Sequence, residues 1–367
     1  MARGVQELLS DASFNRLALK IFRYQTDAVP AYGRFVRGRG IDPERLARWE
    51  DIPPVPVRAF RRLSLFDGEP QEAQARFLTS GTTGGGQGRG LHLVRDLSLY
   101  RASLLPNART HLNPEGETLR VLALLPPPLH RPESSLVHMV DVLREAWDDG
   151  EGGFFADSDW VLDVDGLAQS VQEATVQKQP ILLVGTAFAF VHLMEARMGR
   201  GGLALPPGSR VMETGGFKGR SRAVPREDLY EEMSDLLGLP RERIVNEYGM
   251  TEMLSQFYEP VLREGGPSHP GQRHLVGPPW VRSQLLDPER LHPVPAGEPG
   301  LLQHLDLANL HSVSSLLTED RGVKVPRGFR VLGRVPGAEP RGCSLTMEEL
   351  LGVSDPGQRL GAGGGSR

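Results

Sequence analysis

The spacing of apolar and polar positions divides the chain into amphipathic segments and short apolar runs. Residues 8–22 repeat apolar side chains at helical spacing, which predicts an amphipathic helix near the start of the chain. Residues 134–148 predict a helix that begins at a serine cap, and residues 226–238 predict one that ends at a glycine. Apolar runs short enough for buried strands lie at 119–125, 181–184, 209–213 and 329–332.

Strand and helix patterns alternate from residue 119 to residue 332, and this alternation favours an α/β fold with layered sheets. The proline-rich stretch 51–60 predicts an extended path before the first of these strands. The 30 prolines and 43 glycines fall mostly between the predicted elements, so they mark loops rather than one long linker.

Composition excludes several classes of protein. The 367 residues are 39% hydrophobic, which is enough for a substantial core, and the net charge of -4 disfavours nucleic acid or an anionic membrane as a partner. The basic run 58–64 is short, and we interpret it as a solvated helix face. Neither a signal peptide nor an apolar span of roughly 18 to 20 residues is present, so we expect a soluble, cytoplasmic protein.

Cysteine and histidine usage narrows the chemistry further. The single cysteine, Cys343, excludes an internal disulfide framework and a cysteine-rich zinc site, and it fits a reducing compartment. None of the ten histidines shows the spacing of paired metal ligands, so we expect structural roles for them, His130 and His138 included.

The stretch 77–90, FLTSGTTGGGQGRG, cannot pack a core because it is almost devoid of apolar side chains after Leu78. It does not match the pattern G-x-x-x-x-G-K-[ST]. Successive glycine N–H groups can nevertheless line an anion site, and four hydroxyl side chains add donors, those of Thr79, Ser80, Thr82 and Thr83. By itself, the stretch fits a phosphate-binding loop or a flexible surface loop.

Two further polar clusters follow. In NEYGMTEMLSQ (246–256), Tyr248 offers a flat face for a purine, Thr251 a hydroxyl for a phosphate oxygen and Glu252 a hard oxygen ligand for magnesium. Taken alone, this cluster fits a polar loop beside a helix N-terminus better than a binding site. In LLTEDRG (316–322), an aspartate after a strand can bind both hydroxyls of a ribose, and an arginine in FRVLGR or EPRGCSL can reach phosphate or ribose oxygens.

The order and spacing of TSGTTG, YGMTE, TED and LGR…RG resemble the adenylate-forming enzymes, a superfamily of acyl-CoA synthetases, luciferases and adenylation domains. The closer resemblance is to the acyl-protein synthetase family of LuxE type, and it covers nearly the whole chain. The segments that carry it are 122–140, 212–222, 246–258, 277–281, 305–320 and 331–345.

The resemblance implies the large domain of an adenylate-forming enzyme, with layered mixed β-sheets flanked by helices and a truncated C-terminal lid. It divides the chain into an N-terminal helical segment (1–60), a nucleotide- and acyl-binding core (61–334), a post-hinge segment with Cys343 (335–360) and a disordered tail (361–367). Larger superfamily members carry a catalytic lysine on a lid of about a hundred residues after the hinge, whereas only 33 residues follow Arg334 here.

The resemblance also implies a site for ATP and Mg²⁺. Asp320 would bind the ribose, Arg334 would assist at the hinge, and Thr251 and Glu252 would lie beside the α-phosphate and the magnesium. The adenine would lie near Gly215, Gly216 and the segment Glu247, Tyr248 and Gly249. The phosphates would face Thr79, Ser80, Gly81, Thr82, Thr83 and Gly84. Many superfamily loops end in Pro-Lys, whereas this one continues as GGGQGRG, so Arg89 would replace the lysine.

The implied reaction is attack of a carboxylate, expected to be a fatty acid, on the α-phosphorus of ATP, followed by transfer of the acyl group. Lys218 is the candidate for the missing lid cation, although it also fits a solvated loop lysine. Related proteins load the acyl group onto a cysteine near their C-terminus and pass it to a reductase. Cys343 lies at such a position, and a thiolate is a strong nucleophile, although a lone cysteine is commonly a small buried side chain.

Three functions therefore remain open. The first is an acyl-protein synthetase that transfers the acyl group to Cys343 or to the cysteine of a partner, expected to be an acyl-thioester reductase. The second is an acyl- or aryl-CoA ligase of the phenylacetate type. The third is a nucleotide-binding scaffold subunit with reduced catalysis.

Overall fold

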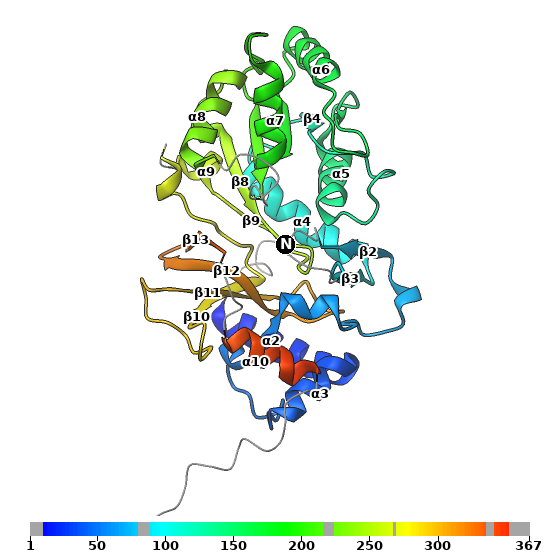
Figure 1. Cartoon of the computed structure of the whole chain (residues 1–367), viewed down its shortest axis with the longest axis vertical. Helices are drawn as coiled ribbons and strands as arrows, with labels where there is room; N and C mark the ends of the chain where they lie inside the picture. Colours follow the sequence, from blue (N-terminus) through cyan, green and yellow to red (C-terminus); the bar gives the residue numbers. More distant parts are fainter. Residues whose placement is uncertain (1–9, 80–87, 216–223, 267–268, 335–340, 352–367) are drawn as a thin grey trace, which may run out of the picture.

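The computed structural model describes residues 10–79, 88–215, 224–266, 269–334 and 341–351. The upper part of the molecule is built around a six-stranded sheet and the lower part around a five-stranded sheet (Figure 1). A two-stranded sheet lies at the level where the two parts meet (Figure 1). The predicted α/β fold with mixed sheets and flanking helices is therefore confirmed.

The six-stranded sheet is parallel except at one edge. Its strand order is β5-β4-β6-β7-β8-β9, and the pair formed by β8 and β9 is antiparallel. Its strands are β4 (Arg120–Ala123), β5 (Gly153–Phe154), β6 (Ile181–Thr186), β7 (Arg210–Thr214), β8 (Ile244–Tyr248) and β9 (Phe257–Tyr258). The apolar runs predicted at 119–125, 181–184 and 209–213 thus form β4, β6 and β7.

Helices cover both faces of this sheet, and this double cover explains why its strands are nearly continuous apolar runs. Val121 and Ala123 of β4 pack with one layer of helices, whereas Leu122 packs with the other. The first layer contains α4 (Leu97–Leu112), α5 (Ser135–Trp147) and α9 (Val261–Glu264). The second layer contains α6 (Val164–Gln177), α7 (Ala187–Arg197) and α8 (Arg226–Leu237).

The five-stranded sheet is antiparallel except for its first strand. β1 pairs in parallel with β12, and β13 pairs with a later part of β12. Its strands are β1 (Val55–Pro56), β10 (Val281–Leu286), β11 (Pro299–Asp306), β12 (Ser315–Val325) and β13 (Gly328–Arg334). Below it lie α2 (Asp11–Ala28), α3 (Pro30–Gly38) and α10 (Arg341–Leu351), as Figure 1 shows.

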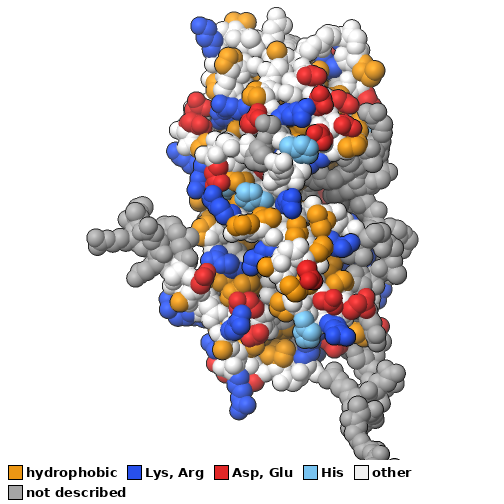
Figure 2. Space-filling model, turned by 90° about the vertical axis from the view of Figure 1, so that its left-hand side faces the viewer, with side chains coloured by type: hydrophobic (Ala, Val, Ile, Leu, Met, Phe, Trp, Pro, Cys, Tyr) orange, Lys and Arg blue, Asp and Glu red, His pale blue; other side chains and the backbone are white. Residues whose placement is uncertain are grey.

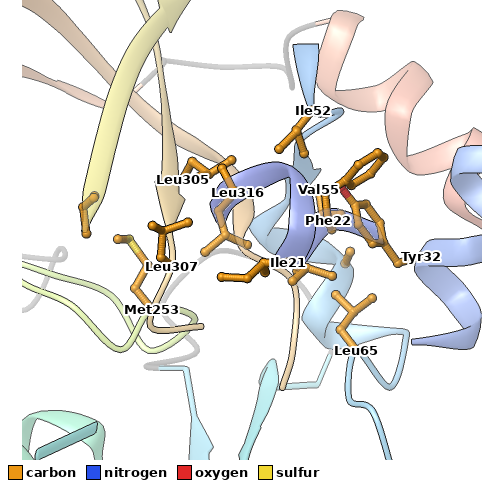
Figure 3. Close-up of a cluster of buried hydrophobic side chains, with 14 of the residues drawn as sticks. Ile21, Phe22, Tyr32, Ile52, Val55, Leu65, Met253, Leu305, Leu307 and Leu316 are labelled. Carbon is orange, nitrogen blue, oxygen red and sulfur yellow. The ribbon is translucent and has the colours of Figure 1, made fainter. Parts of the chain in front are cut away.

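Apolar side chains of α2 and α3 form one core with the five-stranded sheet. Phe22 and Tyr32 from these helices belong to the same buried cluster as Val55 of β1 and Leu316 of β12 (Figure 3). Met253 also belongs to this cluster, and it comes from the segment that follows β8 of the other sheet (Figure 3). The lower core therefore supports a segment in which the sequence predicts site residues.

Local capping explains the two helix ends that the sequence predicts. The Ser134 hydroxyl accepts a hydrogen bond from the N–H of Val137 at 3.3 Å, and α5 begins at the next residue. Gly238 adopts φ 62°, a left-handed conformation that favours glycine, and α8 ends before it. The helix predicted over 8–22 is present as α2 within the described residues.

Two predictions about the chain path are wrong in part. Extended structure in the stretch 51–60 gives way after Pro56 to a 3₁₀ helix, η2 (Val57–Arg61), because no later proline there restricts the backbone. The run 329–332 forms β13 but is not a buried strand. Among its four side chains only Phe329 is buried, since β13 lies at a sheet edge.

The remaining elements are short. The two-stranded sheet consists of β2 (Ala75–Leu78) and β3 (Leu91–Val94), which pair antiparallel. The other 3₁₀ helices are η1 (Trp49–Asp51), η3 (Pro70–Glu72), η4 (Arg241–Arg243) and η5 (Pro270–Gln272). None of the helices in the described part of the chain combines the length and the apolar character needed to cross a bilayer.

A buried carboxylate joins the two larger sheets. Asp306, the last residue of β11, accepts hydrogen bonds from the N–H groups of Leu254 and Ser255 at 3.1 and 3.0 Å and from the Ser255 hydroxyl at 2.7 Å. Burial raises the pKa of Asp306 to about 6, although these hydrogen bonds oppose the shift. The segment after β8 is thereby fixed to the five-stranded sheet.

Candidate active site

The glycine-rich stretch connects β2 to β3, so its two ends are held together as the base of a hairpin. The Thr79 N–H donates to the Gly90 carbonyl at 2.9 Å, and the Gly90 N–H donates to the Thr79 hydroxyl at 2.8 Å. Among the four predicted hydroxyl side chains of this stretch, Thr79 is the one whose structure is described. The others predicted to face phosphate, Ser80, Thr82 and Thr83, lie outside the described residues, as do Gly81 and Gly84.

Arg89 is engaged at this hairpin base. Its Nε donates to the Thr79 carbonyl at 2.6 Å, and a terminal nitrogen donates to the Leu78 carbonyl at 3.1 Å. The other terminal nitrogen lies 3.4 Å from a carboxylate oxygen of Glu133. These contacts hold the two ends of the stretch together, and the contact of Arg89 with phosphate stays a prediction.

The YGMTE segment lies against the same hairpin. His92 of β3 is hydrogen-bonded through Nδ1 to the Thr251 carbonyl at 2.7 Å, and the Ser135 and Thr251 hydroxyl oxygens are 3.3 Å apart. Burial lowers the pKa of His92 to about 4, so its ring is neutral near pH 7 and can act as a donor to this carbonyl. The first and second predicted clusters are therefore adjacent in the fold.

The third cluster joins them through a tyrosine and an aspartate. The Tyr248 hydroxyl, at the end of β8, donates to an Asp320 carboxylate oxygen at 2.8 Å. Arg334 is paired across the strands with Asp320, and its Nε lies 3.5 Å from the other carboxylate oxygen. Burial raises the pKa of Asp320, whereas the Tyr248 hydrogen bond and the Arg334 charge oppose this shift.

Aromatic packing fixes the ring of Tyr248 between the sheets. Its centroid lies 5.8 Å from that of Phe257, 5.7 Å from that of His304 and 5.7 Å from that of Phe329. These neighbours come from β9, β11 and β13, so both sheets contribute to its position. Tyr248, Asp320 and Arg334 thus form one cluster at the junction of the upper and lower parts.

The predicted glycines satisfy local backbone requirements. Gly215 follows β7 with φ 79°, a backbone conformation that residues other than glycine rarely adopt. A Cβ atom at Gly249 would lie 2.5 Å from a carboxylate oxygen of Glu247. That buried carboxylate also accepts a hydrogen bond from the Thr214 hydroxyl of β7, so Glu247 ties the ends of β7 and β8 together. Gly216 lies outside the described residues.

Glu252 is a buried carboxyl group with a shifted pKa. Its pKa is raised to about 7, chiefly by burial and also by the nearby Glu319, whereas a backbone hydrogen bond and the charges of Arg334 and Arg61 oppose the shift. Mg²⁺ is commonly held by one or two carboxylates together with substrate phosphates, so a single carboxylate here fits such a role. Among the residues that the structure describes, no group of three or more His, Cys, Asp or Glu side chains could form a cage for a metal.

Two site residues were missed in the sequence. Arg58 of η2 forms an ion pair with Glu319, whose other carboxylate oxygen lies 3.8 Å from Arg334. Our interpretation of the run 58–64 as a solvated face is therefore wrong for Arg58, because the parallel pairing of β1 with β12 places η2 beside residues 318–320. A basic run directly after a proline-rich strand was the available signal.

Cys343 belongs to a different environment. It lies on α10 with 4% of its surface exposed, packed in a small apolar cluster with Leu286, Leu301 and Leu317. A thiol in such surroundings must become exposed before it can attack an acyl-adenylate. Lys218, the predicted replacement for the lid lysine, lies outside the described residues.

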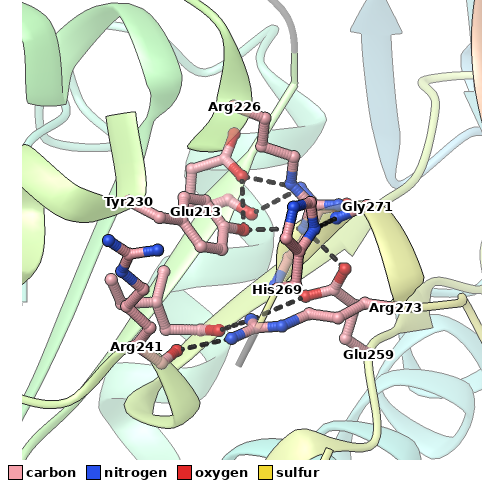
Figure 4. A network of polar contacts seen from close by, with 10 residues as sticks. Glu213, Arg226, Tyr230, Arg241, Glu259, His269, Gly271 and Arg273 are labelled. Carbon is pink, nitrogen blue, oxygen red and sulfur yellow. Dashed lines mark hydrogen bonds and ion pairs between the residues drawn. The ribbon is translucent and has the colours of Figure 1, made fainter. Parts of the chain in front are cut away.

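A buried polar network supports the end of β7 near this site. Arg226 contacts a Glu259 carboxylate oxygen at 2.5 Å and the Tyr230 hydroxyl at 2.8 Å, and Arg273 contacts the second Glu259 oxygen at 3.2 Å (Figure 4). Glu213 lies in the same network, with a carboxylate oxygen 3.3 Å from the Tyr230 hydroxyl (Figure 4). Because Glu213 is separated from Gly215 by Thr214 alone, this network positions the predicted adenine-contacting turn.

Comparison with solved structures assigns the fold to the adenylate-forming ligases. The chain is similar to an open conformation of 2-hydroxyisobutyryl-CoA ligase in complex with 2-HIB-AMP and CoA, with a TM-score of 0.60, 16% identity, and coverage of 89% of this chain and 75% of that chain. It is also similar to ATP-bound MatB from Rhodopseudomonas palustris, with a TM-score of 0.49 and 19% identity over 73% of this chain. It spans 49%, about half, of the MatB chain.

Sequence comparison gives the family. The model described as "Acyl-protein synthetase, LuxE" matches residues 138–352, more than half of the chain, and the chain therefore belongs to this family. It is 22% identical over 359 residues to the "Long-chain-fatty-acid--luciferin-component ligase" of Vibrio harveyi, which covers 94% of this chain and 89% of that protein. The family that the motifs indicate is thus confirmed.

Proposed function

We propose that this chain uses ATP to activate a carboxylic acid as an acyl-adenylate and then transfers the acyl group to a protein thiol. The convergence of Tyr248, Asp320 and Arg334 beside Thr251 and Glu252 is the observation that supports the first half of this reaction. Three segments far apart in the sequence meet there, and each carries groups suited to a different part of a nucleotide.

Each part of ATP has a matching group in this site. The Asp320 carboxylate can accept hydrogen bonds from both ribose hydroxyls, and the Arg334 side chain beside it is 55% exposed and can reach a ribose or phosphate oxygen. The turn at Gly215 and the ring of Tyr248 would border the adenine. The phosphates would extend toward Thr251 and the hairpin base at Thr79.

Magnesium fits the phosphate end of this arrangement. Glu252 would contribute one carboxylate oxygen, and the phosphates would supply others. A bound magnesium ion would neutralise phosphate charge and favour departure of pyrophosphate. The pKa of Glu252, about 7, implies that cation binding strengthens as pH rises through that value, because the ligand is the ionised carboxylate.

The reaction has two steps. A carboxylate oxygen of the acid attacks the α-phosphorus, an O–P bond forms, and pyrophosphate leaves with the electrons of the broken P–O bond. A thiolate then attacks the acyl carbon, and AMP leaves. We assign the chain the task of aligning the reacting groups and neutralising phosphate charge, with Lys218 as a candidate cation.

The identity of the acyl acceptor is less constrained than the position of the nucleotide. Cys343 can serve only if α10 shifts, because its thiol is buried among leucines. A cysteine of a partner, such as an acyl-thioester reductase, requires no such change. The same burial favours a second candidate, a ligase that transfers the acyl group to the free thiol of coenzyme A.

Exchange of labelled pyrophosphate into ATP tests the first step. We expect exchange that depends on an added carboxylic acid, and a panel of acids of increasing chain length will identify the substrate. Absence of exchange with every acid, in protein that is folded by circular dichroism, would contradict adenylation and favour a scaffold subunit.

Labelling with radioactive acid tests the second step. We expect a hydroxylamine-sensitive label on the chain that is lost in Cys343→Ser, while acid-dependent pyrophosphate exchange is retained as the control for folding and adenylation. A label that persists in Cys343→Ser would remove this cysteine from the reaction, and acid-dependent consumption of coenzyme A would favour the ligase.

A further inference from the structure

The short helix η2, which spans the boundary between the predicted N-terminal segment and the core, lies beside the candidate site. β1 runs parallel to β12, with Val55 opposite Leu316 and Pro56 opposite Leu317. The chain that follows β1 therefore continues beside the next residues of β12, which include Glu319 and Asp320. It forms η2 there, and the ion pair between Arg58 and Glu319 confirms this placement.

The geometry of η2 separates its side chains into an inner and a site-facing group. Ala59 and Phe60 are buried, and the Phe60 ring lies 5.5 Å from that of His92, the β3 residue bonded to Thr251. A 3₁₀ helix has three residues per turn, so the side chains of residues i and i+3 project in the same direction. Arg61 therefore projects on the same side as Arg58, one turn further along η2.

This position lies at the phosphate end of the site. Phe60 also packs at the hairpin base, since its Cβ is 3.4 Å from the position of a Cβ on Gly90. Arg61 is also one of the charged groups near Glu252. Arg61 is half-buried, whereas the next residue, Arg62, is exposed.

Three carboxyl groups and three arginines meet in the described part of the site, so its arginines do not outnumber its acids. Glu252, Glu319 and Asp320 converge there, while Arg58 and Arg334 are both engaged with Glu319 or Asp320. A nucleoside triphosphate adds several further negative charges. Binding it at this site requires a cation directed at the phosphates, and a guanidinium group can donate two parallel hydrogen bonds to a phosphate group.

We propose that Arg61 binds the pyrophosphate portion of ATP and stabilises it as the leaving group. This assignment rests on the proposed function and adds the last residue of η2 to the site. Arg58 has a different task. Through its ion pair Arg58 holds Glu319 away from the phosphates, so it positions this carboxylate and does not itself bind ATP.

Binding of ATP and of AMP by Arg61→Ala tests the assignment, because AMP lacks the two phosphates that Arg61 would contact. We expect Arg61→Ala to weaken ATP binding by about ten- to a hundredfold, the usual effect of losing a charge-assisted hydrogen bond, and to leave AMP binding within about twofold. Arg62→Ala is the matched control and should bind both nucleotides as the wild type does. Arg61→Lys keeps the charge without the planar guanidinium group, and its affinity for ATP should lie between those of Arg61→Ala and Arg62→Ala.

Each other outcome is decisive. ATP binding by Arg61→Ala that equals that of Arg62→Ala would refute the assignment and leave the proposed function intact. Equal weakening of ATP and AMP would show that Arg61 supports the fold instead. If Arg61→Ala does not fold, the ratio of ATP to AMP affinity in Arg61→Lys decides, and an unchanged ratio refutes the assignment. A wild type that binds neither nucleotide would refute the proposed function as well.

Discussion

Glu213 is a buried carboxyl group whose surroundings disfavour its ionised form. It is 3% exposed, and burial raises its pKa to about 7 although the Arg226 charge and a hydrogen bond from Asn246 at 2.7 Å oppose the shift. Ionising this group inside the protein costs more than ionising it in the unfolded chain. Its shifted pKa therefore makes the stability of the fold depend on pH.

The sign of this dependence follows from the two pKa values. Below about 4.5 the group is protonated in both states, and between 4.5 and about 7 only the unfolded chain loses its proton, so the free energy of unfolding falls as pH rises. The loss is complete above 7 and amounts to about 3 kcal/mol at most. Glu213→Gln keeps an acceptor oxygen but cannot ionise.

We therefore expect Glu213→Gln to gain stability relative to the wild type as pH rises from about 5 to about 8. Urea unfolding at the two pH values measures the change. Asp235→Asn removes an exposed carboxylate from α8 and serves as the control, with no such gain. A constant difference between Glu213→Gln and wild type at both pH values would contradict the prediction.

Single residues also show how far the sequence could define the site. Tyr248, Asp320 and Arg334 were predicted because each stands in a short motif whose order along the chain is informative, and the structure brings them together. Arg58 and Arg61 belong to no such motif. Their position depends on the pairing of two strands about 260 residues apart, a long-range contact that a local pattern does not encode.

At the scale of elements, α10 carries Cys343 and is fastened to α3. The Arg39 Nε of the α3 C-terminus lies 2.5 Å from a Glu349 carboxylate oxygen, and another Arg39 nitrogen donates to the Thr346 hydroxyl at 3.1 Å. Both charged side chains are about one quarter exposed. We expect release of these contacts to let α10 open and expose the thiol.

We expect Arg39→Ala to increase the rate at which iodoacetamide alkylates Cys343. A partly exposed ion pair contributes about 1 kcal/mol, and this amount raises the population of an open state about fivefold. Alkylation followed by mass spectrometry measures the rate. Arg37→Ala, which removes an exposed arginine of the same helix, should leave it unchanged. An equal rate in both variants would show that the Arg39 contacts do not limit exposure of the thiol.

Elements differ in how well the sequence predicts them. The ends of α5 and α8 were predicted because Ser134 and Gly238 act on their own helices. The 3₁₀ helix η2 was not, because it depends on burial of Ala59 and Phe60 against other segments. The exposed character of β13 has a similar origin, since only the strand order of the sheet makes it an edge.

At the scale of the whole molecule, the candidate site lies where the upper and lower parts meet (Figure 1). Tyr248 comes from the six-stranded sheet, whereas Asp320 and Arg334 come from the five-stranded sheet. The face in Figure 2 shows Lys and Arg side chains interspersed with Asp and Glu. A mixed surface of this kind agrees with the net charge of -4 and gives no support for a polyanionic partner on that face.

A nucleotide bound at this junction would connect the two sheets and should stabilise the whole fold. A ligand that binds only the folded state adds about 2.7 kcal/mol at a hundredfold excess over its Kd. For a chain of this length, that amount corresponds to a rise of roughly 3 °C in the unfolding midpoint. We expect calorimetry in saturating ATP to show such a rise for the wild type.

The same measurement locates the nucleotide. Asp320→Asn removes the carboxylate that would bind the ribose, so its ATP-induced shift should be smaller by at least half at the same ATP concentration. Asp27→Asn, an exposed position on α2, should retain the full shift. A full shift in Asp320→Asn would place ATP away from the junction. If Asp320→Asn instead loses both the ATP-induced rise of the unfolding midpoint and pyrophosphate exchange, nucleotide binding depends on the contact between the two sheets. Asp320 and Tyr248 form that contact, because they are hydrogen-bonded to each other from different sheets.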